Sequence, residues 1–251
     1  MLKKLIKLIL YGIIGVVVLV VGFVILVITL DDNVSISTEP VIPDWTAITA
    51  WPGMIADAVE ARPDPNRTFT AIVLDDSGSM GADIIPAREA VVAALSAMDD
   101  SDRVAVFALN RGVILRFTDV AEARGMLPNL LATVISDGST PLTEAIQASR
   151  AALAEEAAVA GGFGTYRILV TTDGAADNGG ALTLEVEDIA RVTPIQVATI
   201  GVGIGGRHVL RREDLAAFVA IDNVAELESA LRSAIAEEQT FSAITEFGAG
   251  Q

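Results

Sequence analysis

The sequence predicts an α/β protein with a doubly wound, mostly parallel sheet, one antiparallel edge strand and a single transmembrane helix before the sheet. Three observations lead to this class. Apolar runs of strand length alternate with longer segments whose apolar residues recur at helical spacing. Two of the apolar runs are joined directly across Arg111-Gly112, which is typical of a β-hairpin. An uncharged stretch, residues 8–30, precedes all of them.

The first 30 residues have the composition of a membrane anchor. As a helix, residues 8–30 would be about 34 Å long, enough to span a bilayer core of about 30 Å. A cleaved signal peptide is the alternative, but its apolar region normally spans about 7–15 residues and ends at a small-residue cleavage site. Lysines occur only before the run, and the acidic pair Asp31-Asp32 follows it. The positive-inside rule then predicts a single-pass protein with a cytoplasmic N-terminus, residues 1–7, and an extracytoplasmic domain.

The chain beyond the anchor is strongly acidic. It holds all 33 acidic residues and 14 arginines, a net charge near −19. Such a surface repels nucleic acid and anionic lipid, so we expect neither to bind the domain, whereas cations would be attracted. Cysteine is absent, so the domain has to be stabilised by a hydrophobic core rather than by disulfides.

Residues 31–68 have the composition of a stalk. The segment contains five prolines, and proline-rich segments resist regular structure and act as semi-rigid spacers. A short helix is expected near residues 54–61. Both tryptophans of the chain, Trp45 and Trp51, lie here, and the sequence leaves open whether they pack on the domain or lie at the membrane interface.

From residue 69 to residue 238, strands and helices alternate. The first apolar run ends in Asp75 and is typical of a strand buried on both faces, and the run that ends in Asp173 has the same design. Two prolines, Pro86 and Pro141, stand where helices begin, in the first turn that tolerates them. We expect strands over 69–75, 102–110, 113–118, 166–173 and 194–203, and helices over 86–98, 120–132, 141–158, 184–191 and 224–238.

The segment before the last helix fits this pattern less well. Residues 204–223 leave little room for both a full helix and a final strand. Either the helix is reduced to a turn, or residues 212–219 are the helix and the strand is very short. After residue 238, residues 239–251 are expected to form a loosely ordered tail.

Three polar loops follow strands or precede helices, and they are the candidates for function. Their sequences are Asp75-x-Ser77-x-Ser79, Gly138-Ser139-Thr140-Pro141 and Thr172-Asp173-Gly174. Ligands of α/β sheets bind where the carboxyl ends of the strands meet the loops, so these side chains can converge. Two carboxylates, three hydroxyls and no His or Cys make an all-oxygen set, which suits Mg²⁺ or Mn²⁺ rather than zinc or copper. An ion with only two anionic ligands would keep positive charge and attract an outside carboxylate.

These motifs resemble the metal-ion-dependent adhesion site of von Willebrand factor type A (vWA) domains. That family has D-x-S-x-S, a Thr in a GGTPL-like loop and an Asp in a TDG turn, and the resemblance extends over residues 69–238. The matching residues, in order, are Asp75, Ser77, Ser79, Thr140 and Asp173. The resemblance implies that the hydroxyls of Ser77 and Ser79 bind the metal directly and that Thr140 does so in the ligand-ready state. It also implies that the two carboxylates act partly through water and that a partner's Asp or Glu takes the open position. Ser139 stands where the family usually has Gly, and Asp76, the non-ligand residue of the motif, is expected to be solvated.

The function we expect is that of a membrane-anchored, extracytoplasmic protein-binding module and not of an enzyme. It would hold an Asp or Glu of a partner protein through Mg²⁺, with Mn²⁺ or Ca²⁺ as alternatives. High Ala and Arg content without domain lysine suggests a bacterium, and the resemblance then implies a scaffold or assembly factor in an envelope complex, with other vWA proteins or an AAA-type ATPase system.

Two other classes of function stay open. One is a metal-dependent, phosphatase-like hydrolase that uses the same site, and the other is a structural domain with a vestigial site. A Ser-His-Asp hydrolase is not expected, because the chain has one histidine, His208, and no G-x-S-x-G elbow.

Overall fold

The computed structural model describes residues 40–53, 64–204, 208–212 and 215–236. The predicted transmembrane helix, residues 8–30, lies outside these ranges, as do the helix expected near residues 54–61 and the tail, residues 239–251. Within the described ranges, no helix is long and apolar enough to cross a bilayer. The anchor therefore stays a prediction.

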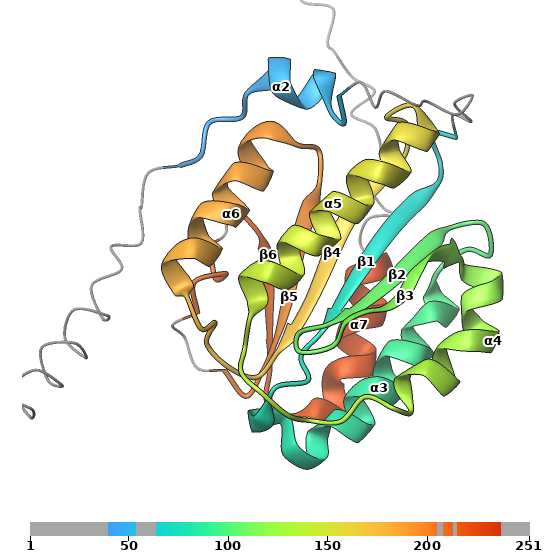
Figure 1. The fold of residues 1–251 in the computed structure, drawn as a ribbon, viewed down its shortest axis with the longest axis vertical. Coiled ribbons are helices and arrows are strands. Elements are labelled where there is room, and N and C mark those ends of the chain that lie inside the picture. Colours follow the sequence, from blue (N-terminus) through green and yellow to red (C-terminus); the bar gives the residue numbers. More distant parts are fainter. Residues whose placement is uncertain (1–39, 54–63, 205–207, 213–214, 237–251) are drawn as a thin grey trace, which may run out of the picture. The chain divides into compact units, whose positions relative to one another are not determined.

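A six-stranded sheet of order β3-β2-β1-β4-β5-β6 forms the centre of the domain (Figure 1). Its strands are β1 (Thr68–Leu74), β2 (Arg103–Ala108), β3 (Gly112–Asp119), β4 (Thr165–Thr172), β5 (Gln196–Val202) and β6 (Ala217–Ile221). All neighbours pair in parallel except β2 and β3, which form an antiparallel hairpin at one edge. The predicted fold class of the domain is confirmed.

Helices cover both faces of the sheet (Figure 1). One face carries α3 (Ile84–Ala94), α4 (Val120–Leu131) and α7 (Leu227–Ala236), and the other carries α5 (Leu142–Ala160) and α6 (Gly179–Val192). Successive residues of β1 point to opposite faces, so Ile72 and Leu74 pack with the first group whereas Ala71 and Val73 pack with the second. Short 3₁₀ helices, η1 (Gly78–Asp83), η2 (Leu95–Ala97) and η3 (Val224–Glu226), adjoin α3 and α7.

The segment before the last helix takes the first of its two predicted forms. Residues 217–221 form β6, which pairs in parallel with β5, so the helix over 212–219 was a wrong alternative. Pairing with β6 satisfies the backbone groups of β5 that a helix would have left open. The α6 helix begins at Gly179, earlier than the expected residue 184, because the Asn178 side chain accepts the Ala181 N–H and caps it.

The segment predicted as a spacer contains a helix and is attached to the domain. Helix α2 (Trp45–Ala50) is capped by the Asp44 carboxylate, which accepts the N–H groups of Thr46 and Ala47. The Asp44 N–H donates to the Arg191 carbonyl at 2.8 Å. The Trp51 ring meets the Tyr166 ring edge-on at 4.9 Å between centroids, whereas Trp45 is 69% exposed. Of the two tryptophans, Trp51 therefore packs on the domain.

Candidate metal centre

Asp75 and the turn that follows it form the first part of the site. The Asp75 side chain is fully buried at the carboxyl end of β1. One of its oxygens accepts the Ser77 N–H at 2.8 Å, and the other accepts the Thr172 hydroxyl at 2.7 Å. These two bonds fix the carboxylate at the base of residues 75–79, which we call the metal loop.

A continuous row of oxygen atoms leads from the metal loop to the end of β4. The Ser77 and Ser79 hydroxyl oxygens lie 3.0 Å apart, and the Ser79 hydroxyl donates to Asp173 Oδ1 at 2.7 Å. Ser77 is buried and Ser79 is exposed. The row therefore begins in the interior at Ser77 and reaches the surface at Ser79, where a ligand from outside can reach it, and Asp173 at its end is partly exposed.

Residues 134–141, which we call the Thr140 loop, lie against the metal loop. The Gly78 N–H donates to the Gly138 carbonyl at 3.0 Å. The Thr140 N–H donates to Asp177 Oδ1 at 3.0 Å, and the Asp177 N–H returns a 3.0 Å bond to the Thr140 carbonyl. The structure thus brings together the three loops that carry the five predicted ligands.

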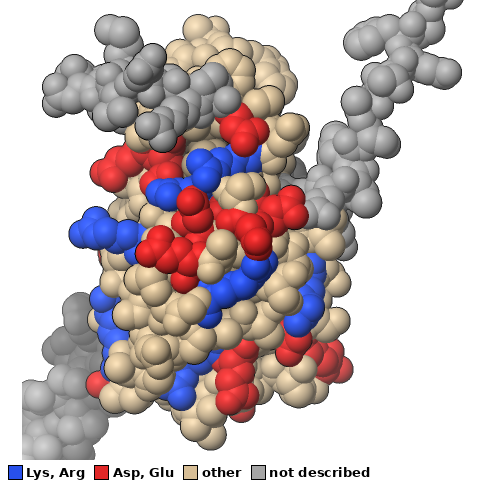
Figure 2. Space-filling view, turned by 90° about the vertical axis from the view of Figure 1, so that its right-hand side faces the viewer, with Lys and Arg blue, Asp and Glu red and all other residues tan. Residues whose placement is uncertain are grey.

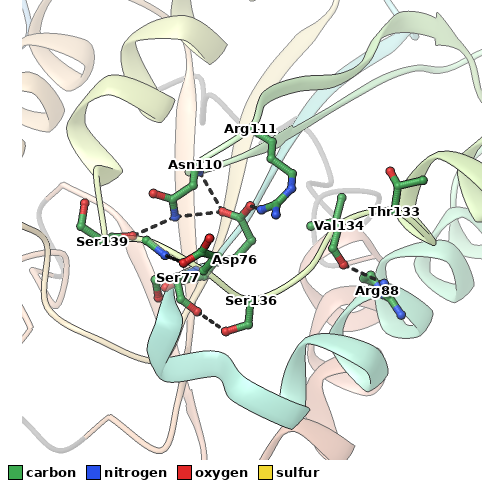
Figure 3. Close-up of polar contacts among 12 residues, drawn as sticks. Asp76, Ser77, Arg88, Asn110, Arg111, Thr133, Val134, Ser136 and Ser139 are labelled. Carbon is green, nitrogen blue, oxygen red and sulfur yellow. Dashed lines mark hydrogen bonds and ion pairs between the residues drawn. The ribbon is translucent and has the colours of Figure 1, made fainter.

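Asp76 differs from its prediction, because it is not solvated. Its side chain is fully buried and pairs with Arg111, with 2.5 Å between Arg111 Nη1 and Asp76 Oδ2. The other carboxylate oxygen, Oδ1, accepts the backbone N–H and the side-chain amide of Asn110 (Figure 3). No local pattern of residues indicates this burial, because Asp76 meets its partners only when the β2–β3 turn folds against the metal loop.

The charge balance at the site favours a cation. Burial raises the pKa of Asp173, the hydrogen bond from Ser79 opposes that rise, and the nearby charge of Asp75 raises the pKa further. Two carboxylates that repel each other in this way are stabilised by a positive ion between or beside them.

The donor set matches a hard divalent ion. Two carboxylates and three hydroxyls are oxygen ligands of the kind that Mg²⁺, Mn²⁺ and Ca²⁺ prefer. In the described part of the chain, no group of three or more His, Cys, Asp or Glu side chains is arranged to hold a metal. A cation at this site would therefore depend on the hydroxyls as well as on the carboxylates, and the residues present fit that requirement.

His208, the single histidine of the chain, contacts the backbone of Gly174, the residue after Asp173. Its Nε2 lies 3.1 Å from the Gly174 carbonyl, and its Nδ1 accepts the Leu210 N–H at 3.2 Å. The ring is therefore neutral, with the hydrogen on Nε2. Burial lowers the pKa of His208, and the bond to Gly174 opposes this only in part.

Acidification should destabilise the domain through His208. The pKa of His208 is lower in the folded chain than in the unfolded chain, so the unfolded chain binds a proton at a higher pH. The free energy of unfolding therefore falls as the pH drops from 6.5 toward the pKa of the folded state. The expected loss is about 1.4 kcal/mol for each unit by which the two pKa values differ. Urea unfolding between pH 7.5 and 5 measures it, and His208→Gln should flatten this part of the profile. An unchanged profile in His208→Gln would assign the effect to other groups.

Several residues of the site were missed by the sequence analysis. They hold the ligand-bearing loops in place through hydrogen bonds, and they are Thr172, Asp177, Asn110, Ser136 and Arg111. Only Thr172 carried a signal, its position next to Asp173 at the end of a buried strand. The others act across 34 to 59 residues of sequence, and no local pattern marks them.

Charged side chains of both signs are mixed on the surface. Figure 2 shows acidic and basic side chains lying next to one another on the face that it presents. At the edge of the sheet opposite the metal loop, Arg67 pairs with Asp119 at 2.9 Å and Arg103 pairs with Glu156 at 3.0 Å. In each of these pairs, a neighbouring carboxylate offsets part of the arginine charge.

Comparison with known proteins agrees with this architecture. Residues 70–175 match the family model of the von Willebrand factor type A domain. This region includes the metal loop, the Thr140 loop and Asp173. A search of curated proteins gives no match.

Solved structures share the fold at low sequence identity. A von Willebrand factor type A protein from Catenulispora acidiphila matches with a TM-score of 0.56 and 17% identity, over 68% of this chain and 42% of that one. The manganese-loaded TRAP protein of Plasmodium vivax matches with a TM-score of 0.51 and 15% identity, over 68% and 74%. The corresponding domain of the type V pili tip protein Mfa5 from Porphyromonas gingivalis gives 0.55 and 13%, over 70% and 96%. The domain described here therefore has the vWA fold.

Proposed function

We propose that this protein is a binding module that holds a divalent cation, preferably Mg²⁺, and through it an Asp or Glu side chain of a partner protein. The observation that carries the proposal is the row of oxygens Ser77–Ser79–Asp173, with the like charge of Asp75 beside it. A cation offsets the repulsion between the carboxylates, and the exposed end of the row admits a partner.

Each predicted ligand has a distinct task in this proposal. The hydroxyls of Ser77, Ser79 and Thr140 bind the cation, while Asp75 and Asp173 balance its charge. The direct ligands of the cation are neutral hydroxyls and the two carboxylates act partly through water, so the open position of the ion attracts a carboxylate from outside. Asp75 is held in place beforehand by Thr172 and by the Ser77 N–H, so little side-chain freedom has to be lost when the ion binds.

The geometry favours binding over hydrolysis. A hydrolase needs a second group near the reacting atoms that can take or give a proton. Both ring nitrogens of His208 are occupied by backbone partners. Tyr166 is buried against Trp51 and Phe69 and bonds the Phe163 carbonyl. Neither side chain is therefore available as the acid or base of a hydrolase.

The proposed setting is the outer side of a bacterial membrane. Residues 8–30 would anchor the chain, and the domain would act as a scaffold or assembly factor in an envelope complex, with other vWA proteins or an AAA-type ATPase system among its partners. Two proteins of the same fold, one a pilus tip protein and one a manganese-loaded protein, support an extracytoplasmic role and a divalent ion as the starting hypothesis.

Thr140→Ala should weaken Mg²⁺ binding and abolish capture of the partner, because the substitution removes one direct ligand and leaves the backbone bonds to Asp177 in place. Isothermal titration calorimetry measures the first effect. Partner capture is measured by a pull-down from native membranes with the solubilised full-length protein. The three conditions are wild type in Mg²⁺, wild type in EDTA and Thr140→Ala in Mg²⁺.

A matched control is Thr133→Ala, which removes an exposed hydroxyl that bonds only the Leu130 carbonyl. The control should behave as wild type in both measurements. Retention of the same partners in all three pull-down conditions would contradict the proposal and indicate a metal-independent scaffold.

A further inference from the structure

Hydrogen bonds hold the Thr140 loop in place, and the side chains that make them, Ser136 and Arg88, lie outside the predicted ligand set. Ser136 Oγ donates to the Ser77 carbonyl at 2.6 Å and accepts the Gly81 N–H at 2.9 Å. The Asp137 N–H donates to the Asp76 carbonyl at 2.8 Å. Arg88 donates to the Val134 carbonyl at 2.7 Å (Figure 3). The loop is thus tied to the metal loop and to α3 along its length.

Asn110 supplies a side-chain contact next to Thr140, in addition to the two bonds that the Thr140 backbone makes with Asp177. Both hydrogens of its side-chain amide are used, since Nδ2 lies 3.2 Å from Asp76 Oδ1 and 2.9 Å from the Ser139 carbonyl (Figure 3). The amide also packs directly on Gly138, where the Cβ atom of any larger residue would lie 2.3 Å from Asn110 Oδ1. Gly138 has a φ of +83°, a backbone conformation that only glycine adopts readily. The contacts of the Asn110 amide with Gly138 and Ser139 therefore constrain the backbone of the Thr140 loop.

The Asp76–Arg111 ion pair fixes Asn110 in turn. Arg111 follows Asn110 in the β2–β3 turn, and its guanidinium holds Asp76 Oδ2 while the Asn110 N–H holds Oδ1. A buried carboxylate with an ion pair and further hydrogen bonds has a defined position, because any displacement would leave its charge unpaired. The order of support runs from Arg111 through Asp76 and Asn110 to the carbonyl of Ser139, one residue before Thr140.

We propose that Asn110, with the Asp76–Arg111 ion pair behind it, is a positioning residue that sets the metal affinity of the site by holding Thr140 in its ligand position. The inference rests on the proposed function, since it assigns a support to that same site. Partners that orient ligands from outside the coordination shell change metal affinity by about 10–100-fold when they are removed. In the described part of the chain, Asn110 forms no hydrogen bond with the side chain of a predicted ligand, so its effect has to pass through the backbone of the Thr140 loop.

The test is Asn110→Ala, which removes the side-chain amide and keeps the backbone bond to Asp76. Calorimetric titration with Mg²⁺ should show about tenfold weaker binding, in line with loss of an outer support. In the metal-free protein, the N–H groups of Gly78 and Asp137, which bond the Gly138 and Asp76 carbonyls, should exchange with deuterium about tenfold faster, because local opening of the loop becomes easier.

Asn223→Ala is the matched control. This residue also forms two hydrogen bonds through its side-chain amide, accepting the Ala225 N–H and donating to Glu226, but both lie within its own turn. Asn223→Ala should leave the Mg²⁺ affinity and the deuterium exchange of the Gly78 and Asp137 N–H groups unchanged, although it should lower the melting temperature about as much as Asn110→Ala does.

The outcomes separate this inference from the proposed function. If wild type binds Mg²⁺ and Asn110→Ala binds it equally well, the positioning role is wrong and the metal site stands. If the variant loses affinity only in proportion to a general loss of stability, with exchange raised throughout the domain, the role is merely structural and the inference fails. If wild type binds no Mg²⁺, the proposed function fails and the inference falls with it.

Discussion

Replacing Asp75 by Asn is expected to abolish measurable Mg²⁺ binding while leaving the domain folded. The substitution halves the anionic charge of the ligand set, and its effect should exceed the roughly 10–100-fold loss caused by removing an outer support. The amide is nearly isosteric and can still accept the Ser77 N–H, so the metal loop keeps its path. Loss of the negative charge also relieves Asp173, whose pKa should return toward its ordinary value. Calorimetry with Mg²⁺ and NMR titration of the Asp173 carboxyl measure the two effects.

Asp75→Ala separates the structural part of this role from the metal-binding part. It leaves the Ser77 N–H without its acceptor, and an unpaired buried group costs about 1–3 kcal/mol. The Thr172 hydroxyl loses its shorter bond and keeps the one to the Gly174 carbonyl. The alanine variant should therefore lose both Mg²⁺ binding and unfolding free energy, whereas the asparagine variant loses only the first.

Asp102→Asn is the matched control for the asparagine variant. Asp102 is also buried and also accepts two hydrogen bonds, here from the backbone N–H groups of Thr68 and Asp99, but it lies at the opposite edge of the sheet. It should bind Mg²⁺ as wild type does. Wild-type affinity in Asp75→Asn would remove Asp75 from the site.

Arg111→Met is expected to lower the free energy of unfolding by about 2 kcal/mol, the size of a charged hydrogen bond lost from a partly buried pair. The reason is the asymmetry of the pair, because the side chain of Arg111 is 28% exposed and that of Asp76 is 0% exposed. Methionine keeps the apolar stem and removes the charge, which leaves the Asp76 carboxylate buried with Asn110 as its remaining side-chain partner. Urea unfolding at pH 7 measures the change.

Arg116→Met provides the comparison on the same hairpin. Arg116 lies on β3, is exposed, and its side chain makes no hydrogen bond or ion pair with any described residue, so its replacement should change stability by less than about 0.5 kcal/mol. Adding Asp76→Asn to Arg111→Met should recover part of the loss, because the unpaired buried charge is then gone. Equal stability of the two methionine variants would show that the ion pair contributes nothing.

The order of elements in the domain and the residue types of the candidate site could be predicted from the amino-acid sequence. Strand and helix periods are local properties, which is why the runs ending at Asp75 and Asp173 were predicted as strands of the same design and why Arg111-Gly112 was predicted as a hairpin turn. The five candidate ligands follow the same logic, since each stands in a short motif at the end of a strand or the start of a helix. The transmembrane helix, residues 8–30, rests on composition alone and stays a prediction.

The side chains that support the site, and the paths of the less regular segments, became apparent only in the folded domain. Asp76 and Arg111 are 35 residues apart, and Asp75 and Thr172 are 97 apart. No periodicity links such pairs, because their contact depends on how the sheet orders its strands. Long-range packing also decides the position of Trp51, which packs on Tyr166, a residue far away in the sequence. It also decides the conformation of residues 217–221, which form a strand because they pair with the edge of β5. Local motifs predict the candidate ligands, and long-range packing positions the loops that carry them.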